Sequence, residues 1–144
     1  MSSIPARLSI VTLGVRDFHR ARDFYRSLGW EEASTSGEPW ACFRTAGALL
    51  ALFPVDDLAV DAAAPTPRSA AQFGGFTLVV MVETPALVDR TLEAARAAGA
   101  TVVKEASDAF GGRSGYFADP EGNRWEVAWL PGARFDERGA LLDV

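Results

Sequence analysis

Cysteine and histidine are almost absent from this sequence: Cys42 and His19 are the single representatives among 144 residues. A disulfide needs two sulfurs and a thiolate zinc site needs several, so both are excluded within the chain, and stability must come from packing. No apolar run approaches the roughly 20 residues that span a bilayer. Residues 1–7 also lack the basic and apolar regions of a signal peptide. We therefore expect a cytoplasmic protein with no membrane partner.

Clusters of positive charge are missing as well. The chain has 14 Lys and Arg against 19 Asp and Glu, a formal net charge of -5. Nucleic-acid phosphates demand a positive surface, so we expect no nucleic-acid partner, and the charge favours neutral or cationic ligands. Hydrophobic residues make up 49% and charged residues 23%, as in ordinary globular proteins. The length suits one domain, residues 1–144, and is too short for two.

Residues 8–53 have the pattern of a compact module. Leu8 to Val15 is an apolar stretch of strand length, and Asp17 follows at the N-cap position of a helix. The apolar residues of that helix recur every three or four positions, and Gly29 can end it. Three further strands are expected at residues 30–33, 40–44 and 48–53, the last two joined as a hairpin.

Residues 76–130 repeat the same order of elements. A strand at residues 76–82 precedes Thr84 and Pro85, which suit the N-cap and first position of a helix that Gly99 ends. Three more strands are expected at residues 101–104, 115–118 and 124–130. The nearly constant spacing between corresponding residues indicates two copies of one module.

The segments outside the two copies differ in composition. Residues 54–75 are rich in Ala, Pro and Asp and indicate a linker across the outside of the sheet, with one helical turn near residues 57–61. Residues 131–144 show no clear periodicity, and we expect an arm packed on the body or on a partner subunit. The sequence thus predicts an α+β fold: two tandem βαβββ modules form a curved mixed sheet around a cavity, with helices outside.

The most specific local signal is the segment GYFADPEGNRWEV, residues 115–127. Its DPEG core has turn chemistry, because proline restricts φ, glycine accepts positive φ and the Asp side chain can bond backbone amides. This predicts a hairpin. If Ala118 pairs with Arg124, then Tyr116 lies opposite Glu126.

Glu126 then stands as an acid in the middle of an otherwise apolar strand. An ionised carboxylate there is costly unless a cation, a metal or a hydrogen-bond donor meets it, so Glu126 is the leading candidate catalytic or binding residue. A purely structural interpretation is also open, in which Glu126 pairs with Arg124, Arg7 or another arginine.

The two-module order together with GYFADPEGNRWEV resembles the vicinal oxygen chelate superfamily of glyoxalases, extradiol dioxygenases and bleomycin-resistance proteins. The stretches VTLGVRD and ARDFYRSLGW resemble that family's first strand and helix, and DPEGN with a following Glu resembles its last hairpin. The resemblance covers nearly the whole chain up to Leu130. It implies a pocket for a small molecule and a homodimer.

The resemblance also implies where a metal would bind. Members with metal activity place one ligand on the first and one on the last strand of each module. By position these ligands fall on Glu126, Ile10, Thr77, and Leu50 or its neighbour Ala51. Hydrocarbon side chains donate no electrons, and a threonine hydroxyl is a poor ligand. We therefore expect no cofactor, and a divalent metal at Glu126 is the disfavoured alternative.

Candidate pocket residues follow from overlaying the copies. The repeat places Tyr116 on Cys42 and Glu126 on Leu50, and alternation adds neighbouring positions to the same enclosed face. Three arginines, Arg44, Arg113 and Arg124, are candidate partners of an anionic group, although surface solvation is the alternative role of each. Cys42 lacks a histidine to activate it and is expected to be a buried structural thiol rather than a nucleophile. The predicted ligand-binding residues are Trp40, Cys42, Leu50, Leu52, Tyr116, Arg113 and Arg124.

Three functions stay open at this point. The first is a glyoxalase/bleomycin-resistance-like protein that binds or sequesters a small organic ligand, such as a cationic aromatic compound, without the complete metal-ligand set. The second is a glyoxalase- or dioxygenase-type lyase, isomerase or oxidoreductase with Glu126 as base or metal ligand. The third is a dimerisation module with a vestigial pocket. The lack of a complete set of metal-ligating residues favours the first function.

Overall fold

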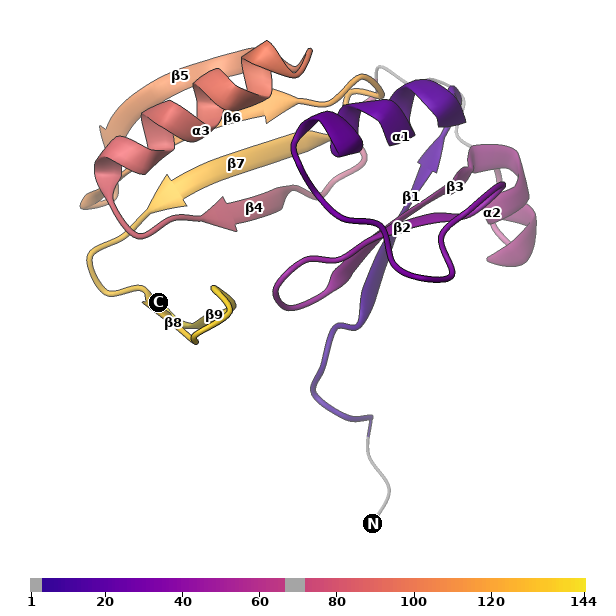
Figure 1. The fold of residues 1–144 in the computed structure, drawn as a ribbon, viewed down its shortest axis with the longest axis horizontal. Coiled ribbons are helices and arrows are strands. Elements are labelled where there is room, and N and C mark those ends of the chain that lie inside the picture. Colours follow the sequence, from indigo (N-terminus) through magenta and orange to yellow (C-terminus); the bar gives the residue numbers. More distant parts are fainter. Residues whose placement is uncertain (1–3, 67–71) are drawn as a thin grey trace.

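The computed structural model describes residues 4–66 and 72–144, so residues 67–71 of the predicted linker lie outside the described residues. Two halves of similar construction lie side by side, and helices α1 and α3 lie on the same side of their strands (Figure 1). The α+β prediction is confirmed. The strands form separate three-, four- and two-stranded sheets instead of one continuous curved sheet.

The first half begins as its apolar periodicity predicts. The carboxylate of Asp17 accepts the backbone N–H of Arg20 at 3.1 Å and caps the first helix, which buries Ala21, Phe24 and Tyr25. Gly29 follows the helix with φ of 82°, a conformation that costs glycine little. The elements of this half are β1 (Ile10–Val15), α1 (Phe18–Ser27), β2 (Ala41–Phe43) and β3 (Leu49–Pro54).

The sheet of the first half has the order β1-β3-β2, with β1 parallel and β2 antiparallel to β3. The prediction of a full strand at residues 30–33 was wrong, because only one bridge, between Glu32 and Phe43, forms there. Glu32 is instead held by Arg22 and Arg26 of α1, and the chain turns away at once into the loop that contains Pro39. Proline carries no N–H for a sheet ladder.

A further helix, α2 (Val55–Asp61), starts directly at the end of β3, within the segment predicted as a linker. It packs against β1 and β3 (Figure 1). Gly14 permits this close approach, because a Cβ atom at that position would stand 2.9 Å from Cγ2 of Val55. The predicted turn near residues 57–61 is therefore a longer helix that packs on the first sheet.

The second half has the complete βαβββ order. The Thr84 hydroxyl caps α3 by accepting the N–H of Leu87 at 3.3 Å, and Pro85 opens the helix, as predicted. The sheet order β4-β7-β6-β5 has the same arrangement as the first sheet, with its first strand parallel to its last. The elements are β4 (Leu78–Met81), α3 (Pro85–Ala97), β5 (Thr101–Ala109), β6 (Gly112–Ala118) and β7 (Arg124–Trp129).

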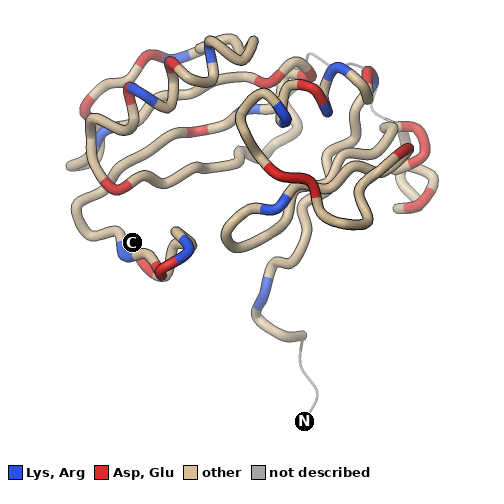
Figure 2. Tube along the Cα trace, viewed as in Figure 1, with Lys and Arg blue, Asp and Glu red and all other residues tan. Residues whose placement is uncertain are grey.

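A single hydrophobic core joins the halves. Tyr25 of α1 contacts Trp125 of β7, with ring centroids 6.1 Å apart, and Phe24 contacts Phe117 of β6 at 6.4 Å. In Figure 2 the charged positions are spread over helices and loops, whereas β4 carries none and β7 has only Arg124 and Glu126. No helix in the part of the chain that the structure describes is long and apolar enough to cross a membrane.

The C-terminal segment is more ordered than its lack of periodicity indicates. Strands β8 (Arg134–Phe135) and β9 (Leu141–Asp143) pair antiparallel as a small hairpin. The hairpin lies below the second sheet, on the side away from α3 (Figure 1).

Candidate ligand cavity

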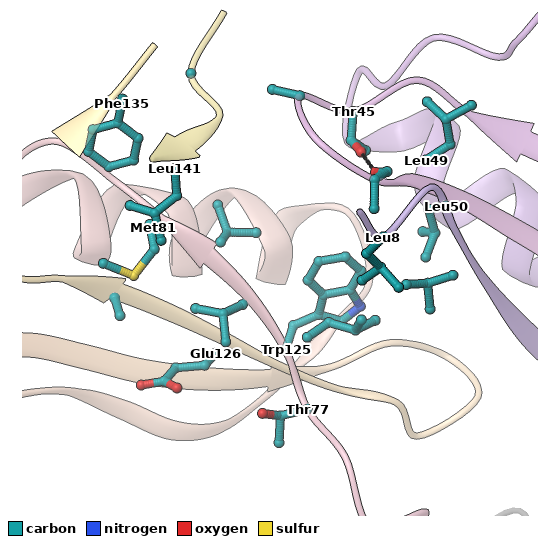
Figure 3. A pocket seen from close by; sticks show the side chains of 18 of the residues that line it. Leu8, Thr45, Leu49, Leu50, Thr77, Met81, Trp125, Glu126, Phe135 and Leu141 are labelled. Atoms are coloured by element: carbon teal, nitrogen blue, oxygen red, sulfur yellow. Dashed lines mark hydrogen bonds between the residues drawn. The ribbon is translucent and has the colours of Figure 1, made fainter. Parts of the chain in front are cut away.

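A cavity of about 860 Å³ opens between the two halves and the C-terminal hairpin (Figure 3). One wall is the β2–β3 hairpin with the chain that leads into β1, and the opposite wall is the sheet face formed by β4 and β7. The third wall is the hairpin of β8 and β9. Most of the lining is hydrocarbon, and β4 by itself contributes Leu78, Val79, Val80 and Met81. An apolar enclosure with few polar groups is the usual form of a small-molecule site.

Glu126 is the one acidic residue of the lining, and Arg44 is the one basic residue, among the residues that the structure describes. The hydroxyl of Tyr116 donates a hydrogen bond of 3.1 Å to Oε1 of Glu126, across the predicted pair of β6 and β7. The pairs Ala118 with Arg124 and Tyr116 with Glu126 are thereby confirmed. Burial raises the pKa of the Tyr116 phenol, and the hydrogen bond to Glu126 raises it further.

No arginine forms an ion pair with Glu126 within residues 4–66 and 72–144. Arg124 instead donates from Nη1 to the carbonyl oxygen of Gly122 at 3.0 Å. The carboxyl group of Glu126 therefore accepts a hydrogen bond from a phenol at one oxygen, beside an apolar cavity, and has no ion-pair partner among the described residues. That arrangement favours a ligand with a cation or a hydrogen-bond donor.

Arg44 lies on the opposite wall, in the β2–β3 hairpin. Its guanidinium is 3.7 Å from Glu31, and its side chain is 57% exposed. The two charged residues of the lining thus differ in setting: Glu126 is half-buried on a strand, whereas Arg44 lies at a solvated rim.

The prediction that Leu50 and Leu52 share a face with Cys42 was wrong. Cys42 pairs with Ala51, whereas Leu50 pairs with Phe43 and lies with Leu52 in the core beneath α1. Side chains alternate between the faces of a strand, so an error of one residue in the overlay reverses the assignment. Leu50 also reaches the cavity edge, and Leu52 does not.

Trp40 and Cys42 lie away from the cavity. Cys42 is completely buried, its backbone N–H donates to Oγ of Ser36 at 3.0 Å, and burial raises the pKa of its thiol. A raised pKa leaves little nucleophilic thiolate, in keeping with the structural role expected for this residue. Trp40 is half-buried beside it.

Arg113 is engaged elsewhere on the surface. Its Nε and Nη2 atoms each donate to Asp89 at 2.8 Å, and Nη1 donates to Asp108 at 3.1 Å. The hydrogen bonds to Asp89 raise the pKa of Arg113, and the same bonds lower that of Asp89. The lining does not include Arg113, Arg124 or Tyr116. The ligand-binding roles of these three residues stay predictions.

Sequence reasoning missed much of the lining. The β4 face with Val79 and Met81 follows from strand alternation opposite Glu126 and Ala128, a signal that was present in the sequence. Phe135 and Leu141 of the C-terminal hairpin had no such signal, because two strands of two and three residues are too short to show a period.

The strand positions that correspond to Glu126 or pair with it carry other types of residue. Tyr116 and Glu126 pair as Cys42 and Ala51 do, so the structural counterpart of Glu126 in the first half is Ala51. Glu126 is paired on β4 with Val79, and Ala51 is paired on β1 with Thr12. No group of three or more His, Cys, Asp or Glu able to hold a metal exists in residues 4–66 and 72–144. One carboxylate among hydrocarbon side chains is a weak site for a divalent ion.

Two βαβββ-type halves around a shared cavity define a class of α+β proteins with a common architecture and varied chemistry. The chain belongs to the Glyoxalase/Bleomycin resistance protein/Dioxygenase superfamily, whose family model matches residues 7–127. The resemblance found in the sequence is thereby confirmed. A comparison with functionally curated proteins gave no match.

Solved structures share the fold. A glyoxalase-related enzyme from Fulvimarina pelagi has a TM-score of 0.85 and 25% identity, covering 96% of this chain and 99% of that one. A glyoxalase/bleomycin resistance protein/dioxygenase family enzyme from Burkholderia phytofirmans has a TM-score of 0.76 and 23% identity over 87% of this chain and 99% of that one. Lactoylglutathione lyase from Agrobacterium tumefaciens has a TM-score of 0.66 and 25% identity over 88% and 96%.

Proposed function

We propose that this protein binds a small organic ligand in the cavity, with Glu126 as the anchor for a cationic or hydrogen-bond-donating group and without a metal. The single observation that carries the proposal is the half-buried carboxylate of Glu126 in an apolar cavity, with Tyr116 as its recorded partner among the described residues. Binding or sequestration of such a ligand is the role we assign to the chain.

The size of the cavity supports a ligand of drug-like dimensions. Small-molecule sites enclose about 300–1,000 Å³, and the cavity measures about 860 Å³. Trp30 and Trp125 are among its lining residues, and the parts of their rings that reach the cavity can contact an apolar or aromatic body.

The electrostatics support a positive or donor group on that ligand. Oε1 of Glu126 accepts from Tyr116, and a ligand donor can use the other oxygen. A charge-assisted hydrogen bond in this apolar setting is stronger than the same bond in water. The net charge of -5 adds a weak attraction for cations.

Two dyes of the same shape test the charge preference. The cation 9-aminoacridine is expected to raise the melting temperature more than neutral acridine and to bind more tightly in fluorescence titration. Glu126→Gln should weaken the 9-aminoacridine complex about tenfold or more and change acridine binding by less than about twofold. Glu83→Gln makes the same charge change at an exposed position outside the cavity and should leave both affinities unchanged. Absence of binding by both dyes at saturation, or an unaltered Glu126→Gln affinity, contradicts the proposal.

Metal independence has its own measurement. Protein purified without chelator is expected to contain no stoichiometric Fe, Mn, Ni or Zn by mass spectrometry, and EDTA should leave dye affinity unchanged. One tightly held metal ion per chain, lost together with binding after EDTA, would overturn this part of the proposal.

A second candidate function is a glyoxalase-type reaction with Glu126 as general base. The position of its carboxylate on the cavity wall favours this, as does the likeness to a lactoylglutathione lyase at 25% identity. The test is lactoylglutathione formation by purified protein. If the protein turns over, and if Glu126→Gln abolishes that turnover while Glu83→Gln preserves it, catalysis and not passive binding is the function.

The homodimer and the dimerisation module with a vestigial pocket stay predictions. Sedimentation velocity, which gives the oligomeric state in solution, tests both.

A further inference from the structure

The C-terminal hairpin contributes a wall of the cavity although it lies outside both modules. Phe135 of β8 and Leu141 of β9 line the cavity, together with Gly139 and Val144. Figure 3 shows Phe135 and Leu141 directed from the hairpin toward the β4 side, where Met81 is located. Leu141 is 43% exposed, and the neighbouring Leu142, which is not part of the lining, is 63% exposed. The face of the hairpin with Phe135 and Leu141 therefore borders the cavity and is still partly open to solvent.

The hairpin is built as a self-contained unit. Oδ1 of Asp136 accepts the N–H groups of Arg138 and Ala140, each at 2.9 Å, and thereby closes the turn between its strands. Arg134 and Asp143 pair across its open end at 3.3 Å. Local hydrogen bonds of this kind help to fix the turn of the hairpin.

Few interactions attach this unit to the rest of the protein. Every hydrogen bond that the structure records for residues 131–144 has its partner within residues 130–144, in the described part of the chain. Phe135 and Leu141 are absent from the side chains that form or border the hydrophobic core. A segment held by few buried apolar contacts opens at low free-energy cost.

The hairpin also lies beyond the family model, which ends its match at residue 127. The cavity walls from β4 and most of β7 lie within that match. The likeness to the Fulvimarina structure covers 96% of this chain and therefore extends into the hairpin. Segments outside the regular core of a fold commonly set which ligand a site accepts.

We propose that the C-terminal hairpin is a hinged cover of the cavity, which closes Phe135 and Leu141 onto the apolar part of the bound ligand. The hinge is the connection Leu130 to Ala133. The cover slows ligand release, because the ligand leaves only after the hairpin lifts. This inference rests on the proposed ligand binding.

Release kinetics of 9-aminoacridine test the cover directly. The full-length double variant Phe135→Ala/Leu141→Ala is expected to release the dye about fivefold faster or more in stopped-flow fluorescence, with a smaller change in association rate. Leu142→Ala shortens a side chain on the other face of the same strand and should match the wild type. Equal release rates in wild type and double variant would overturn the cover.

A measurement without ligand separates this inference from the proposed function. Met81 is half-buried in the cavity wall, and its oxidation by hydrogen peroxide can be followed by mass spectrometry. The double variant should oxidise Met81 several-fold faster than wild type, and Leu142→Ala should not. Unchanged oxidation rules out the cover whether or not dyes bind. Faster oxidation in a protein that binds neither dye supports the cover and contradicts the proposed function alone.

Discussion

The phenolic hydroxyl of Tyr25 in α1 donates a hydrogen bond of 2.5 Å to Oδ2 of Asp119 in the β6–β7 loop. The hydroxyl also accepts the indole N–H of Trp125 at 3.0 Å, and Asn123 donates to the same Asp119 oxygen at 2.9 Å. Tyr25 and Asp119 are both buried, and burial, followed by the charge of Asp119, raises the pKa of the Tyr25 phenol well above its usual value. This network joins α1 to the β6–β7 hairpin and so holds the two halves together beside the cavity.

Replacement of Tyr25 by Phe should destabilise the fold. It removes a donor from the buried Asp119 carboxylate and leaves the indole N–H of Trp125 without its acceptor. The expected loss in the free energy of unfolding is about 2–3 kcal/mol, measured by urea denaturation at neutral pH. Tyr116→Phe is the matched control: it removes a hydrogen bond at a more exposed site and should cost about 1 kcal/mol or less. Equal losses in the free energy of unfolding of the two variants would show that the buried network stabilises the fold no more than the exposed hydrogen bond does.

Glu121 should stabilise the start of α1 from the opposite half of the molecule. Its Oε1 accepts the N–H of Arg16 at 2.8 Å, and its Oε2 accepts the N–H of Asp17 at 2.9 Å. Glu121→Ala is therefore expected to lower the free energy of unfolding by about 1 kcal/mol, as for loss of a helix cap. Glu137→Ala, at an exposed position in the C-terminal hairpin, should change it by less than about 0.5 kcal/mol. A Glu121 variant as stable as wild type would refute this role.

The Glu32 ion pair should make stability depend on pH. The pKa of Glu32 is lowered from 4.5 to about 2, mainly by the hydrogen bond from Nε of Arg22 at 2.6 Å and also by Arg26, although partial burial opposes the shift. Because the folded-state pKa lies below the unfolded one, this contribution is fully present above about pH 4.5 and is lost as the pH falls toward 2.

The size of this effect is about 1–2 kcal/mol, reduced from the full linkage value because the Glu32 side chain is 22% exposed and solvent screens the pair. Urea denaturation of wild type and Glu32→Gln between pH 6 and pH 3 measures it. The variant should be less stable at pH 6, and the difference should shrink toward pH 3. Glu31→Gln, next in the chain and exposed, should show no such convergence.

Features encoded by short stretches of chain could be predicted from the sequence. The caps at Asp17 and Thr84 and the pairing of Tyr116 with Glu126 depend on residues within a few positions of one another, and all were confirmed. The repeated order of strand, helix and strands can be predicted from the spacing of apolar residues alone, because helices and strands have different periodicities. The glutamate at the cavity could be found because a charged residue within an apolar strand is conspicuous.

Features that depend on distant segments could not be predicted in the same way. The overlay of the two halves assigned Leu50 to the position of Glu126, whereas the hydrogen-bonded register assigns Ala51. The loops between strands differ in length in the two halves, so one constant spacing cannot align every strand. The cavity wall from Phe135 and Leu141 had no local signal at all.

The sequence by itself determined the order of elements, the helix ends and the acid opposite Tyr116, because backbone propensity, capping and side-chain alternation act over a few residues. Only the tertiary structure decided which face of the first sheet enters the core, that Glu126 meets a phenol instead of an arginine, and that the C-terminal hairpin lines the cavity. The reason is physical: these outcomes depend on packing between segments far apart in the chain, where a shift of one residue reverses which side chains meet.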